Sequence, residues 1–189
     1  MLRSSTTPYQ GRCAVHGGRN SLGTAFQENT VIRTFPELSQ FTGITRMTQV
    51  TQSRSWFVNS SLVSFEMPSH LQNFDYNALV GMSSINMDVL ELPDTLTRIS
   101  SIGAYGYIGM IVINSELTTF VPGYNFCRSI SGSNRCTWVI KADSVVPIDG
   151  NNLANNEYYV PDALVDAYKA ATNWSTVTAR IHPISELPN

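Results

Sequence analysis

The 189-residue sequence predicts a small solenoid of short parallel β-strands and turns, with an irregular N-terminal arm and a C-terminal capping helix. Three observations support this fold class: an apolar pattern that recurs three times, a strand-then-helix pattern near the C-terminus, and a glycine-rich start without a sustained period. We therefore expect an arm over residues 1–34, a solenoid over 35–155 and a strand-helix cap over 156–189.

The recurring pattern has five apolar positions at fixed spacing. The three copies read Leu62-x-x-Phe65-x-Met67-x-x-x-Leu71-x-x-Phe74, Met87-x-x-Leu90-x-Leu92-x-x-x-Leu96-x-x-Ile99 and Ile108-x-x-Ile111-x-Ile113-x-x-x-Leu117-x-x-Phe120, offset by 25 and 21 residues. The apolar-x-apolar triplet predicts a short strand, because alternate side chains of a strand lie on opposite faces. One copy cannot enclose its own apolar face, so we expect stacked copies with strands paired in parallel.

The arm, residues 1–34, is rich in glycine, serine and arginine and shows neither a helical nor a strand period for long. A segment of this composition buries little apolar surface by itself. We therefore expect a neighbouring subunit to hold it.

The C-terminal region predicts a cap. Residues 156–160 have the composition of a strand, and Pro161 and Asp162 suit the first turn of a helix that follows. The apolar residues of this helix recur at helical spacing, at Leu164, Val165, Tyr168 and Ala171. We expect the helix to end near residues 172–173, and Trp174 and Ile181 to cover the open end of the core.

The charge balance excludes several classes of partner. Charged residues make up 14% of the chain and the net charge is -2, so the clustered basic face that binds a phosphate backbone is not expected. No apolar run approaches the length of a membrane span, and the first residues lack the apolar core of a secretory signal. Neither nucleic acid, nor membrane insertion, nor classical secretion is expected.

The residues that carry chemistry are scattered. His16, His70 and His182 lie far apart, and no phosphate-loop, dinucleotide or hydrolase motif occurs. We expect no catalytic residue, metal or cofactor. Residues 149–152 are rich in oxygen ligands but lack the pattern of a calcium loop, so we interpret them as a turn.

Two features leave an alternative open. Cys127 and Cys136 could form a disulfide, although free thiols are favoured because Cys13 leaves the number odd. Glu66 and Glu91 occupy the same outward slot of successive strands and could suggest a glycosidase, although an exposed, mildly repulsive pair is favoured.

A partner would contact the outward slots of the strands. These slots are Ser64, Glu66, Val89, Glu91, Met110 and Val112. Their three apolar members could form an exposed contact patch. Equally, they could be ordinary surface residues that loops or the arm cover. Whether Trp138 or Val139 faces inward in the strand that precedes Lys141 is also open.

Residues 35–187 resemble the BspA-like leucine-rich-repeat family, which occurs in gut bacteria and sometimes in their phages. Phe35-Pro36-Glu37-Leu38 resembles the opening segment of the family, Trp56-Phe57-Val58-Asn59-Ser60-Ser61-Leu62 and Ala78-Leu79-Val80-Gly81-Met82 resemble its repeat junctions, and Tyr159-Val160-Pro161-Asp162-Ala163-Leu164 with Trp174 is similar to its C-terminal cap. Ser60 and Met82 replace the junction cysteines of the family.

The resemblance implies a non-enzymatic leucine-rich-repeat protein that mediates protein-protein or surface attachment. Together with the missing signal, it favours a structural or receptor-facing component of a phage virion that contacts neighbouring subunits. The alternative is a secreted bacterial cell-surface adhesin that binds host protein or glycan.

Overall fold

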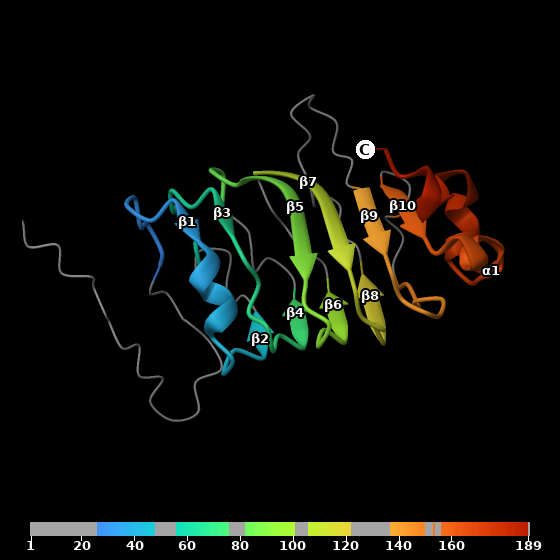
Figure 1. The fold of residues 1–189 in the computed structure, drawn as a ribbon, viewed down its shortest axis with the longest axis horizontal. Coiled ribbons are helices and arrows are strands. Elements are labelled where there is room, and N and C mark those ends of the chain that lie inside the picture. Colours follow the sequence, from blue (N-terminus) through green and yellow to red (C-terminus); the bar gives the residue numbers. More distant parts are fainter. Residues whose placement is uncertain are drawn as a thin grey trace, which may run out of the picture.

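The computed structural model describes residues 26–47, 56–75, 82–100, 106–121, 137–149, 153 and 156–188. In these ranges the protein consists of short parallel strands with few helices, arranged along one long axis (Figure 1). The expectation of a β-rich fold with parallel strands is confirmed. The first 25 residues of the arm, all three cysteines and most of the turn at residues 149–152 lie outside the described residues.

The largest sheet has five parallel strands in the order β11-β10-β9-β7-β5. In chain order these are β5 (Asn86–Leu92), β7 (Tyr107–Ile113), β9 (Thr137–Ile140), β10 (Glu157–Val160) and β11 (Ile181–Pro183). A two-stranded sheet of β1 (Thr34–Phe35) and β3 (Ser64–Phe65) precedes it in the chain. The amide of Asn86 donates a 3.0 Å hydrogen bond to the carbonyl oxygen of Val63 and so links the two sheets.

A four-stranded parallel sheet forms the second layer. Its order is β2 (Arg46–Met47), β4 (Asn73–Asp75), β6 (Arg98–Ser100) and β8 (Thr119–Val121). From β1 to β9 the chain alternates between the two layers. In sequence order, each strand of the second layer follows one strand of the first layer and precedes the next. Figure 1 shows the two rows of strands along the molecule.

The strand register matches the register of the sequence pattern. Leu90 pairs with Ile111, and Phe74, Ile99 and Phe120 pair in turn across the four-stranded sheet. Fourteen of the fifteen apolar side chains of the three copies are buried, and Met87 is partly buried against the same core. The repeated residues therefore form one continuous core between the two layers.

The C-terminal region has the predicted order of elements, a strand followed by a helix. Strand β10 is followed by a short 3-10 helix (Asp162–Leu164), the helix α1 (Val165–Ala170), a 3-10 helix (Trp174–Arg180) and β11. Trp174 and Ile181 are buried against the end of the core, as expected. Helix α1 is shorter than expected, because Ala171 is extended and Asn173 has a positive φ of 67°.

The described part of the predicted arm belongs to the fold. Phe26 contacts the rings of Phe35 and Phe57, at centroid distances of 5.0 and 5.6 Å. The amide of Glu28 donates a hydrogen bond to Val58, and the amide of Ser61 donates one to the carbonyl oxygen of Asn29. Residues 26–34 are thus tied to the loop before β3, and β1 is followed by a 3-10 helix (Pro36–Gln40).

Candidate binding groove

The outward face of the five-stranded sheet presents side chains in rows. The register aligns Val89 with Met110, then Thr137 and Glu157, across β5, β7, β9 and β10. The parallel row two residues further along consists of Glu91, Val112, Val139 and Tyr159. Side chains of one row are neighbours because adjacent strands lie about 4.8 Å apart.

Most of the expected partner-facing residues are accessible. Glu66 and Glu91 are exposed, Val89 is 42% exposed, and Ser64 and Met110 are half-buried. Val112 fits the second alternative, that outward residues are covered: it belongs to an outward slot, but its side chain is only 4% exposed. The expected apolar patch is therefore reduced to Val89 and Met110.

In β9, Trp138 faces the core and Val139 faces outward, yet both side chains are buried. Trp138 pairs with Ile111 and Tyr158, and Ile140 pairs with Ile113, so both belong to the core face. Val139 lies on the outward face yet is only 2% exposed. The outward face is therefore apolar and buried at its centre, around Val112 and Val139, and accessible towards β5.

A shallow groove of about 770 Å³ lies on this accessible side, between β3 and β5. Its apolar lining comes from the two strands and the residues just after them: Phe65, Met67, Met87, Val89, Leu90 and Leu92. Because Phe65, Met67, Leu90 and Leu92 also belong to the buried core, the floor of the groove is the outer surface of that core.

Polar contacts between successive segments fix one edge of the groove. The hydroxyl of Thr95 donates to the carbonyl oxygens of Ser69 and Leu71, at 3.1 and 2.8 Å. The amide of Ser69 in turn donates a 3.2 Å hydrogen bond to the carbonyl oxygen of Ser39. Three consecutive segments of the chain are thereby linked at this edge.

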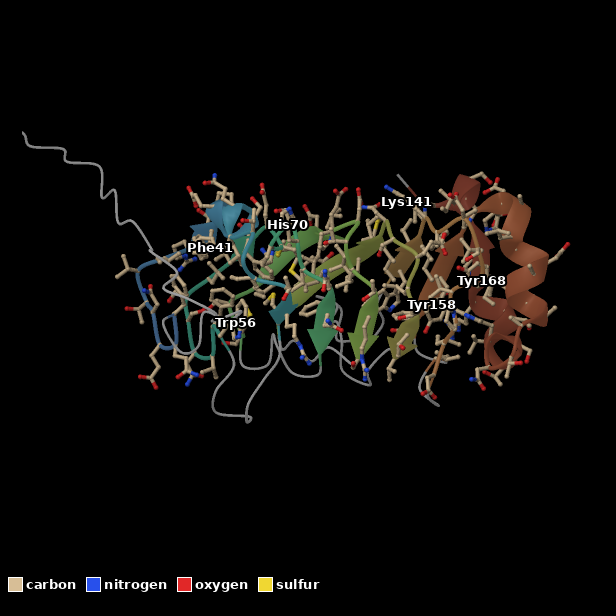
Figure 2. The ribbon with its side chains drawn as sticks, turned by 90° about the horizontal axis from the view of Figure 1, so that it is seen from below. Phe41, Trp56, His70, Lys141, Tyr158 and Tyr168 are labelled. Atoms are coloured by element: carbon tan, nitrogen blue, oxygen red, sulfur yellow. The ribbon has the colours of Figure 1, made fainter. Side chains whose placement is uncertain are left out.

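The rim of the groove is acidic. Its lining contains three carboxylates, Glu66, Glu91 and Asp94, and one histidine, His70. All four side chains are exposed. Figure 2 shows His70 on the surface of the molecule. None of the three carboxylates forms a hydrogen bond or ion pair with another described residue. They are therefore available to a cationic ligand, whereas no group of three metal-ligating side chains occurs among the described residues.

A second polar cluster lies at the other end of the outward face. Glu157 accepts hydrogen bonds from Arg180 and, at 3.0 Å, from Nε2 of His182 when that nitrogen is protonated. The ring of Tyr159 lies over His182 at a centroid distance of 5.2 Å. Burial and, to a lesser extent, the nearby carboxylates of Glu157 and Glu186 raise the pKa of the Tyr159 hydroxyl.

Sequence reasoning missed both the groove and this cluster. The groove joins residues from four separate segments, and no local motif marks it. A signal for the second cluster does exist in the sequence: extending the apolar-x-apolar register to β10 would have placed Glu157 and Tyr159 in the outward slots.

Comparison of the chain with protein-family models, curated proteins and solved structures finds no match. Among the described residues, no helix combines the length and the apolar character needed to cross a membrane.

Proposed function

We propose that this chain is a non-enzymatic leucine-rich-repeat protein of the BspA-like type, and that it binds a protein partner through the outward face of its five-stranded sheet. The chain alternates between two layers of parallel strands, and the apolar slots of successive copies are in register. Both features support a solenoid of stacked repeats. The sequence resemblance supports the family.

One observation carries the binding role. Val89 and Met110 are adjacent on the outward face and accessible, and Val89 lines a groove with an apolar floor and a charged rim. An apolar centre with a polar rim is the usual composition of a protein interface. The groove is open and shallow, which suits an extended segment or a flat protein surface better than an enclosed small molecule.

The partner that we propose is a neighbouring subunit of an assembly, and the assembly that we propose is a phage virion, in a structural or receptor-facing position. Light scattering of the purified full-length chain over a range of concentrations measures its mass and tests whether the chain associates with copies of itself. We expect a mass above 20.9 kDa that rises with concentration. A monomer at every concentration would contradict self-association.

A paired variant tests whether the outward face mediates this association. Val89→Lys with Met110→Lys places two cations in the accessible row and should return the chain to a monomer with an unchanged melting temperature. The matched control is Gln72→Lys with Ala179→Lys, which adds the same charge at two exposed residues away from the row and should leave the mass unchanged.

The virion location has its own test. Mass spectrometry of purified particles of the phage that encodes the chain should detect it, and the variant with lysines at positions 89 and 110 should be incorporated at a lower level. Particles that lack the chain altogether would contradict the location.

A bacterial surface adhesin is the second candidate. The neighbouring Tyr159 and His182 rings beside Glu157 and Arg180 favour it, because aromatic faces flanked by charged groups suit host proteins and glycans. Binding to immobilised host matrix proteins or to a glycan panel, lost in Tyr159→Ala, would support this alternative over the virion.

A further inference from the structure

We propose that the groove between β3 and β5 is the docking site of the N-terminal segment of the same chain, residues 1–25. The inference deepens the proposed function, because it names what occupies the binding groove in the free protein. A partner that uses the groove would then have to displace this segment.

The charge of the chain is divided unequally. Residues 1–25 contain Arg3, Arg12 and Arg19 and no aspartate or glutamate, so their side chains carry a charge of +3 with histidine neutral. The remaining residues contain the other 9 of the 12 basic residues and all 14 acidic residues, which gives -5. The positive charge of the segment and the negative charge of the rest of the chain favour association of the segment with an acidic surface of the fold.

The groove offers such a surface. Glu66, Glu91 and Asp94 are exposed along its rim and make no ion pair with a described residue. Each can therefore pair with an arginine without breaking an existing contact, and an arginine can bind a carboxylate through two parallel hydrogen bonds. The rim provides three carboxylates for the three arginines of the segment.

The floor of the groove suits the rest of the segment. Between its arginines the segment carries Tyr9 and Val15, with Leu2 and Leu22 near its ends. Met87 and Val89 present partly exposed apolar surface in the groove. Apolar atoms of the segment that this surface removes from water add a hydrophobic contribution to docking, so the contact does not depend on charge alone.

The point of attachment of the segment lies near the groove. Phe26, the first described residue, contacts Phe35, and Phe35 pairs with Phe65, which lines the groove. An extended chain covers roughly 3.3 Å per residue, so the segment reaches the whole groove from this anchor. A short tether also raises the local concentration to the millimolar range. We therefore favour the groove of the same chain over that of a neighbouring subunit.

Limited trypsin digestion of the full-length protein tests the proposal, because trypsin cleaves after each of the three arginines. Cleavage after Arg12 and Arg19, followed by mass spectrometry, should be about tenfold slower than in a variant with a neutral groove rim, Glu66→Gln with Glu91→Gln and Asp94→Asn. Raising the salt from about 0.1 M to about 1 M shortens the Debye length from about 10 Å to about 3 Å, and should accelerate cleavage in the wild type but not in the variant with the neutral rim.

The matched control neutralises three exposed carboxylates outside the groove, Asp149→Asn with Asp166→Asn and Glu186→Gln. This variant has the same net charge as the groove variant and should keep the slow cleavage of the wild type. Equal cleavage rates in all three proteins would overturn the proposal.

Protein concentration distinguishes the chain's own groove from that of a second copy. Protection that is constant from low to high micromolar concentration supports docking within one chain, whereas protection that appears only at high concentration would show that a second copy provides the groove and would overturn our assignment. The digestion test and the mass test can fail separately. Equal cleavage rates would overturn docking of residues 1–25, whereas a mass that Val89→Lys with Met110→Lys leaves unchanged would contradict the proposed role of the outward face in association.

Discussion

The indole Nε1 of Trp174 donates a 2.8 Å hydrogen bond to the carbonyl oxygen of Val146, and both residues are buried. The rings of Tyr158 and Tyr168 meet the same indole edge-on, at centroid distances of 4.9 and 5.0 Å. This contact connects the C-terminal 3-10 helix to the loop after β9, and so closes the end of the core.

Replacing Trp174 with phenylalanine should destabilise the protein by about 2–4 kcal/mol. The change leaves a cavity beside Tyr158 and Tyr168 and removes the donor from the buried carbonyl group of Val146. Urea denaturation followed by circular dichroism measures the loss. Thr178→Ala, at an exposed residue of the same helix, is the control and should change the free energy of unfolding by less than about 0.5 kcal/mol.

The hydroxyl of Tyr168 provides a pH-dependent prediction. It accepts a 3.1 Å hydrogen bond from the amide of Val146 and donates one to the carbonyl oxygen of Ser144. Burial raises the pKa of Tyr168 to about 12, to which the carboxylate of Glu116 contributes less, while the hydrogen bond from Val146 opposes the shift. In the unfolded chain the pKa of a tyrosine is about 10.

Because the pKa is higher in the folded state, the stabilisation is complete below about pH 10 and is lost as the pH rises towards 12. Tyr168→Phe should therefore be less stable than the wild type at pH 7, by about 1–3 kcal/mol, since the amide of Val146 loses its acceptor. The difference between the two proteins should become smaller above pH 10. Urea denaturation at several pH values measures it, and a constant difference would contradict the assignment.

Much of the fold could be predicted because its determinants are local. The alignment of Leu90 with Ile111, and that of Phe74 with Ile99, follow from apolar residues at fixed spacing. The burial of Trp174 could be predicted because it is a large apolar residue just beyond an amphipathic segment. A strand has only two faces, so a short pattern already determines which side chains form the core.

The features that could not be predicted depend on residues far apart in the sequence. Val112 is buried although its slot faces outward, and the register places Val139 beside it from a strand 27 residues later. The early end of α1 depends on Asn173, whose side chain donates a 2.9 Å hydrogen bond to the carbonyl oxygen of Ile148. Tertiary contacts of this kind override local propensity.

Alanine substitutions along β5 test the two faces of that strand. Leu90→Ala and Leu92→Ala remove buried side chains and should each cost about 2–5 kcal/mol. Val89→Ala changes an exposed side chain on the opposite face of the strand and should cost less than about 1 kcal/mol. Thermal unfolding of the three variants compares them. If Val89→Ala is as costly as Leu90→Ala, the inward and outward faces of β5 are assigned wrongly.

Asn29 tests whether the residues after the N-terminal segment belong to the folded unit. Its side-chain oxygen accepts hydrogen bonds from the amides of Val31 and Ile32, at 3.0 and 2.8 Å, and its carbonyl oxygen accepts one from Ser61. Asn29→Ala removes the first two and should destabilise the protein by about 1 kcal/mol. Thr30→Ala, at an exposed neighbour, should have almost no effect.

The location of the instability is more informative than its size. If the turn at Asn29 anchors the chain before β1, hydrogen exchange in Asn29→Ala should become faster at the amides of Ser61 and Val63, which donate to Asn29 and Arg33, and stay unchanged in β10. Faster exchange in β10 as well would mean that the whole domain unfolds together. An unchanged rate at Ser61 and Val63 would mean that the turn is not part of the folded unit, and would remove the anchor on which docking of residues 1–25 into the adjacent groove depends.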